Sequence, residues 1–360
     1  MYKKCLLFFY MWIMNQYSTL EEMENFRNKK YRKIIITFLA IFILILTISY
    51  GYGKETREVD LIVRSINLHH SAADFPLRLR GIAHEFHHDY PHQIGLIGMQ
   101  ELERGTMNNC LRGKSYNNGA KCLAAELISL YGQKAEARIF EKNWLQQHAE
   151  VSGIIVDDNW KIIENKSWSI GYNRILLEVF LEHKTKGYRL RFYNTHFSSN
   201  TNVKWFEKIW YGYNSTKDKG QERRSRQASK VFEIVRERAK PGELPPIVVG
   251  DFNSGRNFVT GEAEVSVRKM EEHFWRPIDN FRKFCSDYTV IDNIYIGKKE
   301  SFPDSQGYFK LIKWHRIRMH KKPVSVDGRR IDELTDHNAE GFSFNILIKP
   351  NKSIQRERPS

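Results

Sequence analysis

The chain has 360 residues, of which 41% are hydrophobic and 13% aromatic, which is enough apolar side chain to bury a large core. This composition excludes a wholly disordered protein. Lysine and arginine outnumber aspartate and glutamate by 57 to 42, so the formal net charge is +15 and a polyanionic partner is indicated, either nucleic acid or an anionic lipid surface. The four cysteines form no CxxC pair, which argues against a zinc ribbon or an iron–sulfur site.

The first long feature is the apolar run 34–50, which follows a cluster of basic residues. Its length of roughly 17 residues is at the lower limit for a membrane span, and the basic flank predicts that residues 1–33 stay in the cytoplasm. Ser49 and Gly51 stand where a small-x-small cleavage site would lie. A signal peptide that starts at Met23 and an uncleaved membrane anchor therefore both remain open, and either one predicts that the rest of the chain is exported.

Residues 58–349 are predicted to form one domain, followed by a polar tail at 350–360, because no repeat and no Pro/Gly/Ser-rich linker divides them. Short runs rich in Ile, Val, Phe and Tyr predict eight strands, at 59–67, 94–100, 153–156, 175–182, 188–195, 247–250, 289–296 and 342–348. Helices are predicted at 76–88, 119–131, 205–210 and 221–239. This order of elements predicts an α/β fold in which two packed sheets are flanked by helices.

Polar side chains capable of catalysis stand at the ends of the predicted strands. They are Asn67, Gln100 with Glu101, Asn194 to His196 (NTH), Gly250 to Asn253 (GDFN), Asp292 (in DNIY) and Asp336 with His337. A strand end holds a side chain rigidly at the mouth of a sheet, and catalysis requires such rigidity. Six strand ends of this kind therefore indicate one shared active site.

In this order, the motifs QE, NTH, GDFN, DNIY and DH resemble the endonuclease/exonuclease/phosphatase superfamily of metal-dependent phosphodiesterases. The superfamily includes deoxyribonucleases, abasic-site endonucleases, bacterial sphingomyelinases and inositol-phosphate phosphatases. The resemblance covers about 290 residues, 58–349. It implies a four-layered α/β sandwich with two mixed β-sheets.

The resemblance also implies a cofactor, Mg²⁺ or Mn²⁺, bound by oxygen ligands from Asn67, Glu101 and Asp336. No organic cofactor is implied. The implied catalytic residues are His196, Asp251, Asn253, Asp292 and His337.

The resemblance to this superfamily implies that Asp251 is the general base that deprotonates the attacking water. It implies that Asn253 orients the water or the phosphate. His337 hydrogen-bonds a phosphate oxygen and is held by Asp292. His196 binds phosphate as well. Three further residues are expected near the substrate phosphate: Glu150, Arg174 and Asn194.

Two basic segments, 217–230 and 313–330, bear on the substrate. The first is expected to be a solvated helix face. The second is expected to form a loop at the active-site rim, where Trp314 would stack on a base and Arg316, Arg318, Lys321 and Lys322 would contact phosphates. We therefore favour a nuclease that acts on nucleic acid. A phospholipid or inositol phosphodiesterase is the alternative, because the same charges attract anionic membranes.

Two other motifs leave alternatives open. His84, Glu85 and His88 spell HExxH, the zincin signature, but they stand in a histidine-rich stretch, so a solvated helix face is expected rather than a metalloprotease. Cys110 and Cys122 enclose a loop rich in Gly and Asn. An oxidised pair and two free thiols are both compatible with the sequence.

Overall fold

The computed structural model describes residues 59–69, 74–102, 108, 110, 113–141, 151–199, 216–256, 262–284, 291–319 and 323–348. All of them belong to the unit Val59–Ser360. The apolar run 34–50, the helix predicted at 205–210 and the tail 350–360 lie outside the described residues. Among the helices of the described part, none is long and apolar enough to cross a membrane.

Two six-stranded sheets form the centre of the fold. The first has the order β11-β14-β1-β2-β4-β3. Its strands, in chain order, are β1 (Leu61–Asn67), β2 (Leu96–Leu102), β3 (Ala135–Glu141), β4 (Val151–Asp157), β11 (Tyr308–Ile317) and β14 (Ala339–Leu347). Only β1 and β2 are parallel neighbours, and the other pairs of this sheet are antiparallel.

The second sheet repeats the same pattern of directions, with the order β5-β6-β7-β8-β10-β9 and one central parallel pair, β7 and β8. Its strands are β5 (Trp160–Gly171), β6 (Arg174–His183), β7 (Arg189–His196), β8 (Ile247–Asp251), β9 (Phe274–Trp275) and β10 (Asp292–Gly297). A separate hairpin pairs β12 (Val324–Val326) with β13 (Arg329–Ile331).

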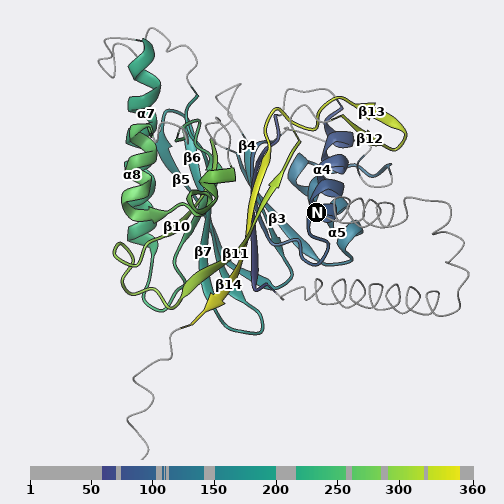
Figure 1. Ribbon diagram of the computed structural model, residues 1–360. Coiled ribbons are helices and arrows are strands. Elements are labelled where there is room, and N and C mark those ends of the chain that lie inside the picture. Colours follow the sequence, from purple (N-terminus) through teal and green to yellow (C-terminus); the bar gives the residue numbers. More distant parts are fainter. Residues whose placement is uncertain are drawn as a thin grey trace, which may run out of the picture. The chain divides into compact units, whose positions relative to one another are not determined.

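Helices cover the outer face of each sheet, so the unit has four layers (Figure 1). The helices α4 (Phe75–Asp89) and α5 (Gly119–Tyr131) pack on the first sheet, and α7 (Thr216–Arg238) and α8 (Val265–His273) pack on the second. A short 3₁₀ segment, η2 (Pro277–Phe284), follows β9. One apolar cluster lies under each helical layer, and a third fills the space between the sheets. The predicted fold class, two mixed sheets flanked by helices, is confirmed.

The local sequence explains the helix at 119–131, whose bounds were predicted correctly. Asn118 accepts a hydrogen bond from the backbone N–H of Lys121 at the start of α5, and Gly132 adopts a left-handed conformation at its end, where glycine is favoured. Cys122 in the first turn of α5 forms a disulfide with Cys110. The alternative of an oxidised pair is therefore the correct one.

All eight predicted strands are present, but the sequence did not indicate the strands at the sheet edges. The missing strands of the two sheets are β3, β5, β9 and β11, which are the four outermost ones. In β3, β5 and β11, charged residues interrupt the apolar pattern, and such charges at a sheet edge discourage pairing with other chains. The fourth strand, β9, has only two residues. In β11, for example, Lys310, Lys313 and Arg316 are exposed.

This finding corrects the expectation of a loop at 313–330. Residues 313–317 belong to β11, and 324–331 form the β12–β13 hairpin. The basic residues of β11 therefore lie on a rigid sheet edge rather than on a loop.

Candidate active site

The site lies at one end of the inter-sheet core, where strands of both sheets end. Asn67 closes β1 and Asp251 closes β8, and each continues a row of side chains that faces this core, such as Val63 in β1 and Val249 in β8. His196 pairs with Asp251 in the parallel register of β7 and β8. Asp251 in turn pairs with Asp292, the first residue of β10. The fold thus collects these residues at one rim, which we call the active-site rim.

Asn67 links the two sheets at this rim. Its side-chain nitrogen donates hydrogen bonds to Oε1 of Glu101 and to Oδ2 of Asp251, both at 3.0 Å. Its side-chain oxygen accepts a hydrogen bond from the backbone N–H of His69 at 3.0 Å. The amide nitrogen thus holds the two carboxylates in place, whereas the side-chain oxygen keeps a second lone pair, so the role of Asn67 as a cation ligand stays a prediction.

Asp251 is buried and accepts hydrogen bonds on both carboxylate oxygens. Its Oδ1 accepts from the backbone N–H of Asn253 at 2.8 Å, and its Oδ2 accepts from Asn67. Burial raises the pKa of Asp251 above its ordinary value. Both Glu101 (φ 53°) and Asn253 (φ 48°) have left-handed backbones, which are strained in such residues and cluster at functional sites.

His196 is buried between Asp251 and Asn253. Its Nε2 lies 3.5 Å from Oδ2 of Asp251 and accepts a hydrogen bond of 2.9 Å from the amide nitrogen of Asn253. Burial, and secondarily the charge of Arg174, lowers the pKa of His196 to about 4, so the ring is neutral at pH 7. The amide of Asn253 also donates to the carbonyl oxygen of Phe197 at 3.0 Å. Nε2 of His196 is thus an acceptor in this arrangement, and the expected contact with phosphate would need the other ring nitrogen.

His337 and Asp292 form a close pair. Nδ1 of His337 lies 2.7 Å from Oδ2 of Asp292, as expected, and its Nε2 lies 3.9 Å from Oδ2 of Asp251. Burial opposes protonation of His337, but the neighbouring carboxylates, above all Asp292, outweigh it and raise the pKa to about 10. The imidazole is therefore cationic at neutral pH and suited to bind an anionic oxygen.

The donor set at the rim fits a hard divalent cation. Asp251, Asp292 and His337 each offer a ligand atom within 4.8 Å of the others. Since Asp292 and His337 already bind each other, the partly exposed carboxylate of Glu101 is the more suitable ligand, 3.9 Å from the neutral His196. Carboxylate oxygens with room for water molecules are the environment that Mg²⁺ and Mn²⁺ prefer.

The structure describes some of the other residues that were predicted to contact the substrate, and others lie outside its described part. Arg174 opens β6. Burial lowers its pKa to about 10, although the neighbouring charges of Asp251 and Glu101 act in the opposite direction. Glu150, Lys321 and Lys322 lie outside the described residues. Arg316 and Arg318 are exposed, and Nε of Arg316 lies 3.3 Å from Oε1 of Glu340.

Asn194 requires a correction, because it cannot contact the substrate. It is fully buried between the sheets, where its nitrogen donates to the carbonyl oxygens of Met99 and Gly153 at 2.8 and 2.9 Å. Its oxygen accepts a 2.6 Å hydrogen bond from Gln100. Asn194 faces the same side of β7 as His196 but lies two residues deeper in the core. Its role is to join the two sheets.

Two positioning residues were not predicted. Arg78 of α4 is buried and donates hydrogen bonds to the carbonyl oxygens of Leu334 at 2.6 Å and Leu68 at 3.1 Å. The hydroxyl of Thr335 donates to the carbonyl oxygen of Asn67 at 2.7 Å. These contacts fasten the segment after β1 to the segment that carries Asp336 and His337. The sequence could have indicated the role of Arg78, because this residue stands on the apolar face of the helix predicted at 76–88. A charged residue buried on such a face needs hydrogen-bond partners.

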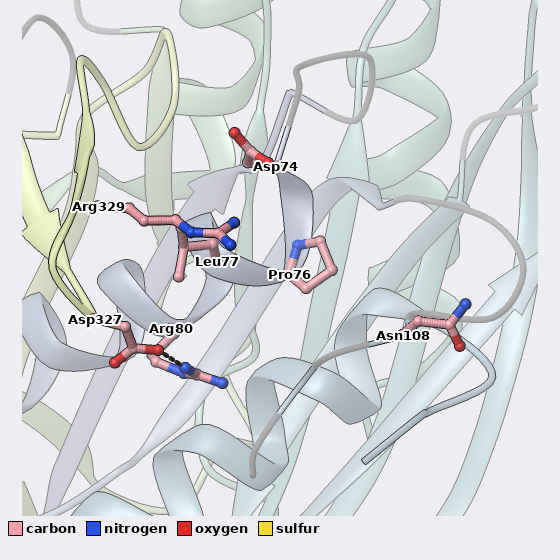
Figure 2. Close-up of a pocket in the computed structure, with 7 residues that line it drawn as sticks. All are labelled: Asp74, Pro76, Leu77, Arg80, Asn108, Asp327 and Arg329. Atoms are coloured by element: carbon pink, nitrogen blue, oxygen red, sulfur yellow. Dashed lines mark hydrogen bonds and ion pairs between the residues drawn. The ribbon is translucent and has the colours of Figure 1, made fainter. Parts of the chain in front are cut away.

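The HExxH motif lies on α4 with His84 and His88 exposed, and among the described residues these histidines belong to no group able to hold a metal. A pocket of about 480 Å³ opens near the start of the same helix, beside the β12–β13 hairpin (Figure 2). Figure 2 shows Arg80 reaching toward Asp327, with which it forms an ion pair. None of the catalytic candidates lines this pocket.

Comparisons with known proteins are informative only at the level of fold. No protein-family model matches the chain, and no curated protein matches its sequence. Among solved structures, an endonuclease/exonuclease/phosphatase family protein from Bacteroides thetaiotaomicron has a TM-score of 0.51 at 16% identity, covering 80% of this chain and 97% of that one. An endonuclease/exonuclease/phosphatase from Bacteroides vulgatus has a TM-score of 0.51 at 14% identity, covering 80% of this chain and 100% of that one. The catalytic domain of human Nocturnin, solved with bound sulfate, has a TM-score of 0.50 at 12% identity, covering 80% and 93%.

Proposed function

The chain has the endonuclease/exonuclease/phosphatase fold, and from this premise we propose that it is a metal-dependent phosphodiester hydrolase whose substrate is nucleic acid. The observation that carries the proposal is the joint placement of two groups at the active-site rim. Asn67 bridges the carboxylates of Glu101 and Asp251, and the cationic His337 lies 3.9 Å from the same Asp251 oxygen. A carboxylate base beside a cationic donor is the arrangement that phosphoester hydrolysis needs.

Asp251 is the group placed to take the proton of the attacking water. Asn67 and the backbone N–H of Asn253 hold its carboxylate in one orientation. Its raised pKa brings its basicity closer to neutral pH, which improves proton transfer. His196, held neutral by burial, accepts a hydrogen bond from Asn253 and so fixes that residue beside the base.

His337 is the group placed to bind a phosphate oxygen, because its ring is protonated and held by Asp292. Arg174 adds a second positive charge near Asp251 and Glu101. A divalent cation held at Glu101 would offset the charge that develops on the phosphate. Together, these charges would stabilise the pentacovalent transition state.

The preference for nucleic acid is supported by charge. The formal net charge is +15, and β11 presents Lys313 and Arg316 along a sheet edge, with the exposed Arg318 directly after its last residue. Arg316 pairs in register with Glu340, two positions into β14, which Asp336 and His337 precede in the chain. This edge therefore leads to the active-site rim, where it can follow a phosphate backbone.

We also propose that the hydrolase is exported. The apolar run 34–50 with its basic flank supports this location, as does the disulfide between Cys110 and Cys122, because disulfides persist in oxidising compartments. Fractionation of cells that express the chain, followed by protease protection, tests this proposal. A chain found only in the cytoplasmic fraction would contradict it.

The test of the function is incubation of the metal-free protein with plasmid DNA, RNA and sphingomyelin, each with EDTA, Mg²⁺ or Mn²⁺. We expect cleavage of nucleic acid that needs the cation and is abolished by EDTA. Full activity in EDTA would contradict the metal-dependent mechanism. Hydrolysis of sphingomyelin without cleavage of DNA or RNA would instead favour the phospholipid alternative.

A further inference from the structure

The pocket of about 480 Å³ between the start of α4 and the β12–β13 hairpin is not used by the mechanism above (Figure 2). Its volume is in the range of ligand pockets, which is about 300–1,000 Å³. Its lining combines apolar side chains with charged groups of both signs: Asp74, Pro76, Leu77, Arg80, Asn108, Asp327 and Arg329. Carboxylates in the lining repel a simple anion, so the pocket suits an organic ligand with both donors and acceptors of hydrogen bonds.

The hairpin that forms one wall of this pocket is fixed to α4. Asp327 (φ 50°) and Gly328 (φ 74°) both have left-handed backbones, as in the tight turns that join two strands of a hairpin. Val326 and Ile331 are buried in the apolar cluster under α4. Arg80 of α4 forms an ion pair with Asp327. The pocket is therefore preformed, and these two charges satisfy each other.

The carboxylate of Asp74 and the guanidinium of Arg329 are in a different situation. Both side chains are exposed, and among the residues that the structure describes neither has an ion-pair partner. Asp74 is the N-cap of α4, but its side chain makes no capping hydrogen bond. Figure 2 shows the guanidinium of Arg329, the first residue of β13, directed from the hairpin toward the start of the helix. One acceptor group and one donor group are thus available to a ligand in the pocket.

Both walls of the pocket continue into the active-site rim. Asp74 follows His69 by five residues, and Nδ1 of His69 lies 3.5 Å from Oδ1 of Asp336. Arg329 precedes Asp336 by seven residues. Arg78 of α4 donates hydrogen bonds to a carbonyl oxygen in each connecting segment. Because an extended chain covers at most about 3.6 Å per residue, Arg329 lies within about 25 Å of Asp336. Stacked nucleotides that each advance about 3.4 Å cover this distance in about seven steps.

We propose that this pocket binds an unpaired guanine base of the substrate. Guanine presents two adjacent N–H donors, at N1 and N2, which match the two oxygens of the Asp74 carboxylate. Its O6 and N7 accept two hydrogen bonds from an arginine, here Arg329. Pro76 and Leu77 offer apolar contact to the face of the ring.

The other bases fit this pair of groups less well. Adenine and cytosine carry a ring nitrogen lone pair beside their amino group, and a carboxylate repels that lone pair. Thymine and uracil have a single N–H between two carbonyl oxygens. The proposal rests on the proposed function, because it takes the substrate to be nucleic acid.

The experiment measures binding of the metal-free protein, in EDTA, to fluorescein-labelled single-stranded oligothymidylates. One oligonucleotide is unsubstituted, and the others carry a single guanine, adenine or cytosine. The test variants are Asp74→Asn, which keeps a residue that tolerates the left-handed backbone, and Arg329→Gln. Arg330→Gln is the matched control, because it removes an exposed arginine from the next position of β13, which does not line the pocket.

We expect the parent to bind the guanine oligonucleotide at least about 10-fold more tightly than the other three, because two bidentate pairs recognise the base. This preference should fall at least about 5-fold in each test variant. In Arg330→Gln, binding to all four oligonucleotides should weaken by the same factor and the preference should remain, because a phosphate contact does not depend on the base.

No binding, or equal affinities of the parent for the four oligonucleotides, would overturn the proposal. A guanine preference that survives in either test variant, or that is lost in Arg330→Gln, would also overturn it, because recognition would then lie outside the pocket. The two proposals fail separately. Base-independent binding by a protein that hydrolyses nucleic acid overturns the guanine pocket alone, whereas guanine-dependent binding by a protein without phosphodiesterase activity supports the pocket and contradicts the proposed function.

Discussion

Asp251 carries the chemistry in the proposed mechanism, and one substitution isolates its role. Asp251→Asn keeps the shape of the side chain but removes its capacity to accept a proton. We expect kcat per folded molecule on a small phosphodiester to fall at least about 100-fold. Under the same conditions His84→Ala should keep the parent rate. Near-normal turnover in Asp251→Asn would contradict the assignment of the base.

The buried carboxyl group of Glu340 should make the free energy of unfolding depend on pH. It is buried and accepts a hydrogen bond of 2.8 Å from Trp314. Burial raises its pKa from the ordinary 4.5 to about 8, although Arg316 and Trp314 act in the opposite direction. The folded state therefore holds this proton more tightly than the unfolded state does. The resulting stabilisation is complete below about pH 4.5 and is lost as the pH rises through about 8.

Glu340→Gln removes this titration but keeps the size of the side chain. The free energy of unfolding of the parent, relative to this variant, should fall between pH 4.5 and 8 and then level off. Urea denaturation at pH 5, 7 and 9 measures the difference. Parallel stabilities of the two proteins across this range would contradict the raised pKa.

At the scale of elements, the edge strand β11 bears on the substrate. Arg316→Gln with Arg318→Gln removes one charge from β11 and one directly after its last residue. If both side chains contact phosphates of duplex DNA, the slope of log affinity against log salt should flatten by about 0.9 for each. Hydrolysis of a small phosphodiester should be retained, because Asp251 and His337 are untouched. A fluorescence binding assay at several salt concentrations measures the slope.

The matched control for this experiment is Lys161→Ala with Lys166→Ala, which removes two charges from β5, the edge of the other sheet. It should leave the slope unchanged. Equal slopes for the β11 variant and the parent would mean that this edge is a solvated face, and the main support for nucleic acid over lipid would be lost.

Which elements could be predicted from the sequence depended on their place in the sheets. The interior strands are apolar on both faces or nearly so, and their local pattern is clear, as in β8 with IVVG before Asp251. The edge strand β5 has a run of four polar residues, 164–167, in its middle and was missed. Its partner β6 determines its structure, and no short window of sequence contains that partner.

At the scale of the whole described unit, the two sheets are joined by Asn194. Asn194→Leu would leave the carbonyl oxygens of Met99 and Gly153 without their hydrogen bonds in the core. Each buried polar group left unsatisfied costs about 1–3 kcal/mol, so we expect the free energy of unfolding to fall by at least about 2 kcal/mol. Turnover per folded molecule should change little. A variant of parent stability that has lost its activity would instead indicate a contact with substrate.

The sequence by itself determined the order of the catalytic motifs and their places at strand ends, because an apolar strand followed by polar groups is a local pattern. Asp251 was found in this way, whereas Asp292 stands inside the predicted strand 289–296 and its role was implied by the family resemblance. The fold class followed from the order of the elements. Only the tertiary structure decided which atoms meet. The orientation of Asn67 depends on Asp251, 184 positions along the chain, and on the N–H of His69. The depth of Asn194 in the core and the placement of His69 beside Asp336 depend likewise on contacts between distant segments, which no local pattern records.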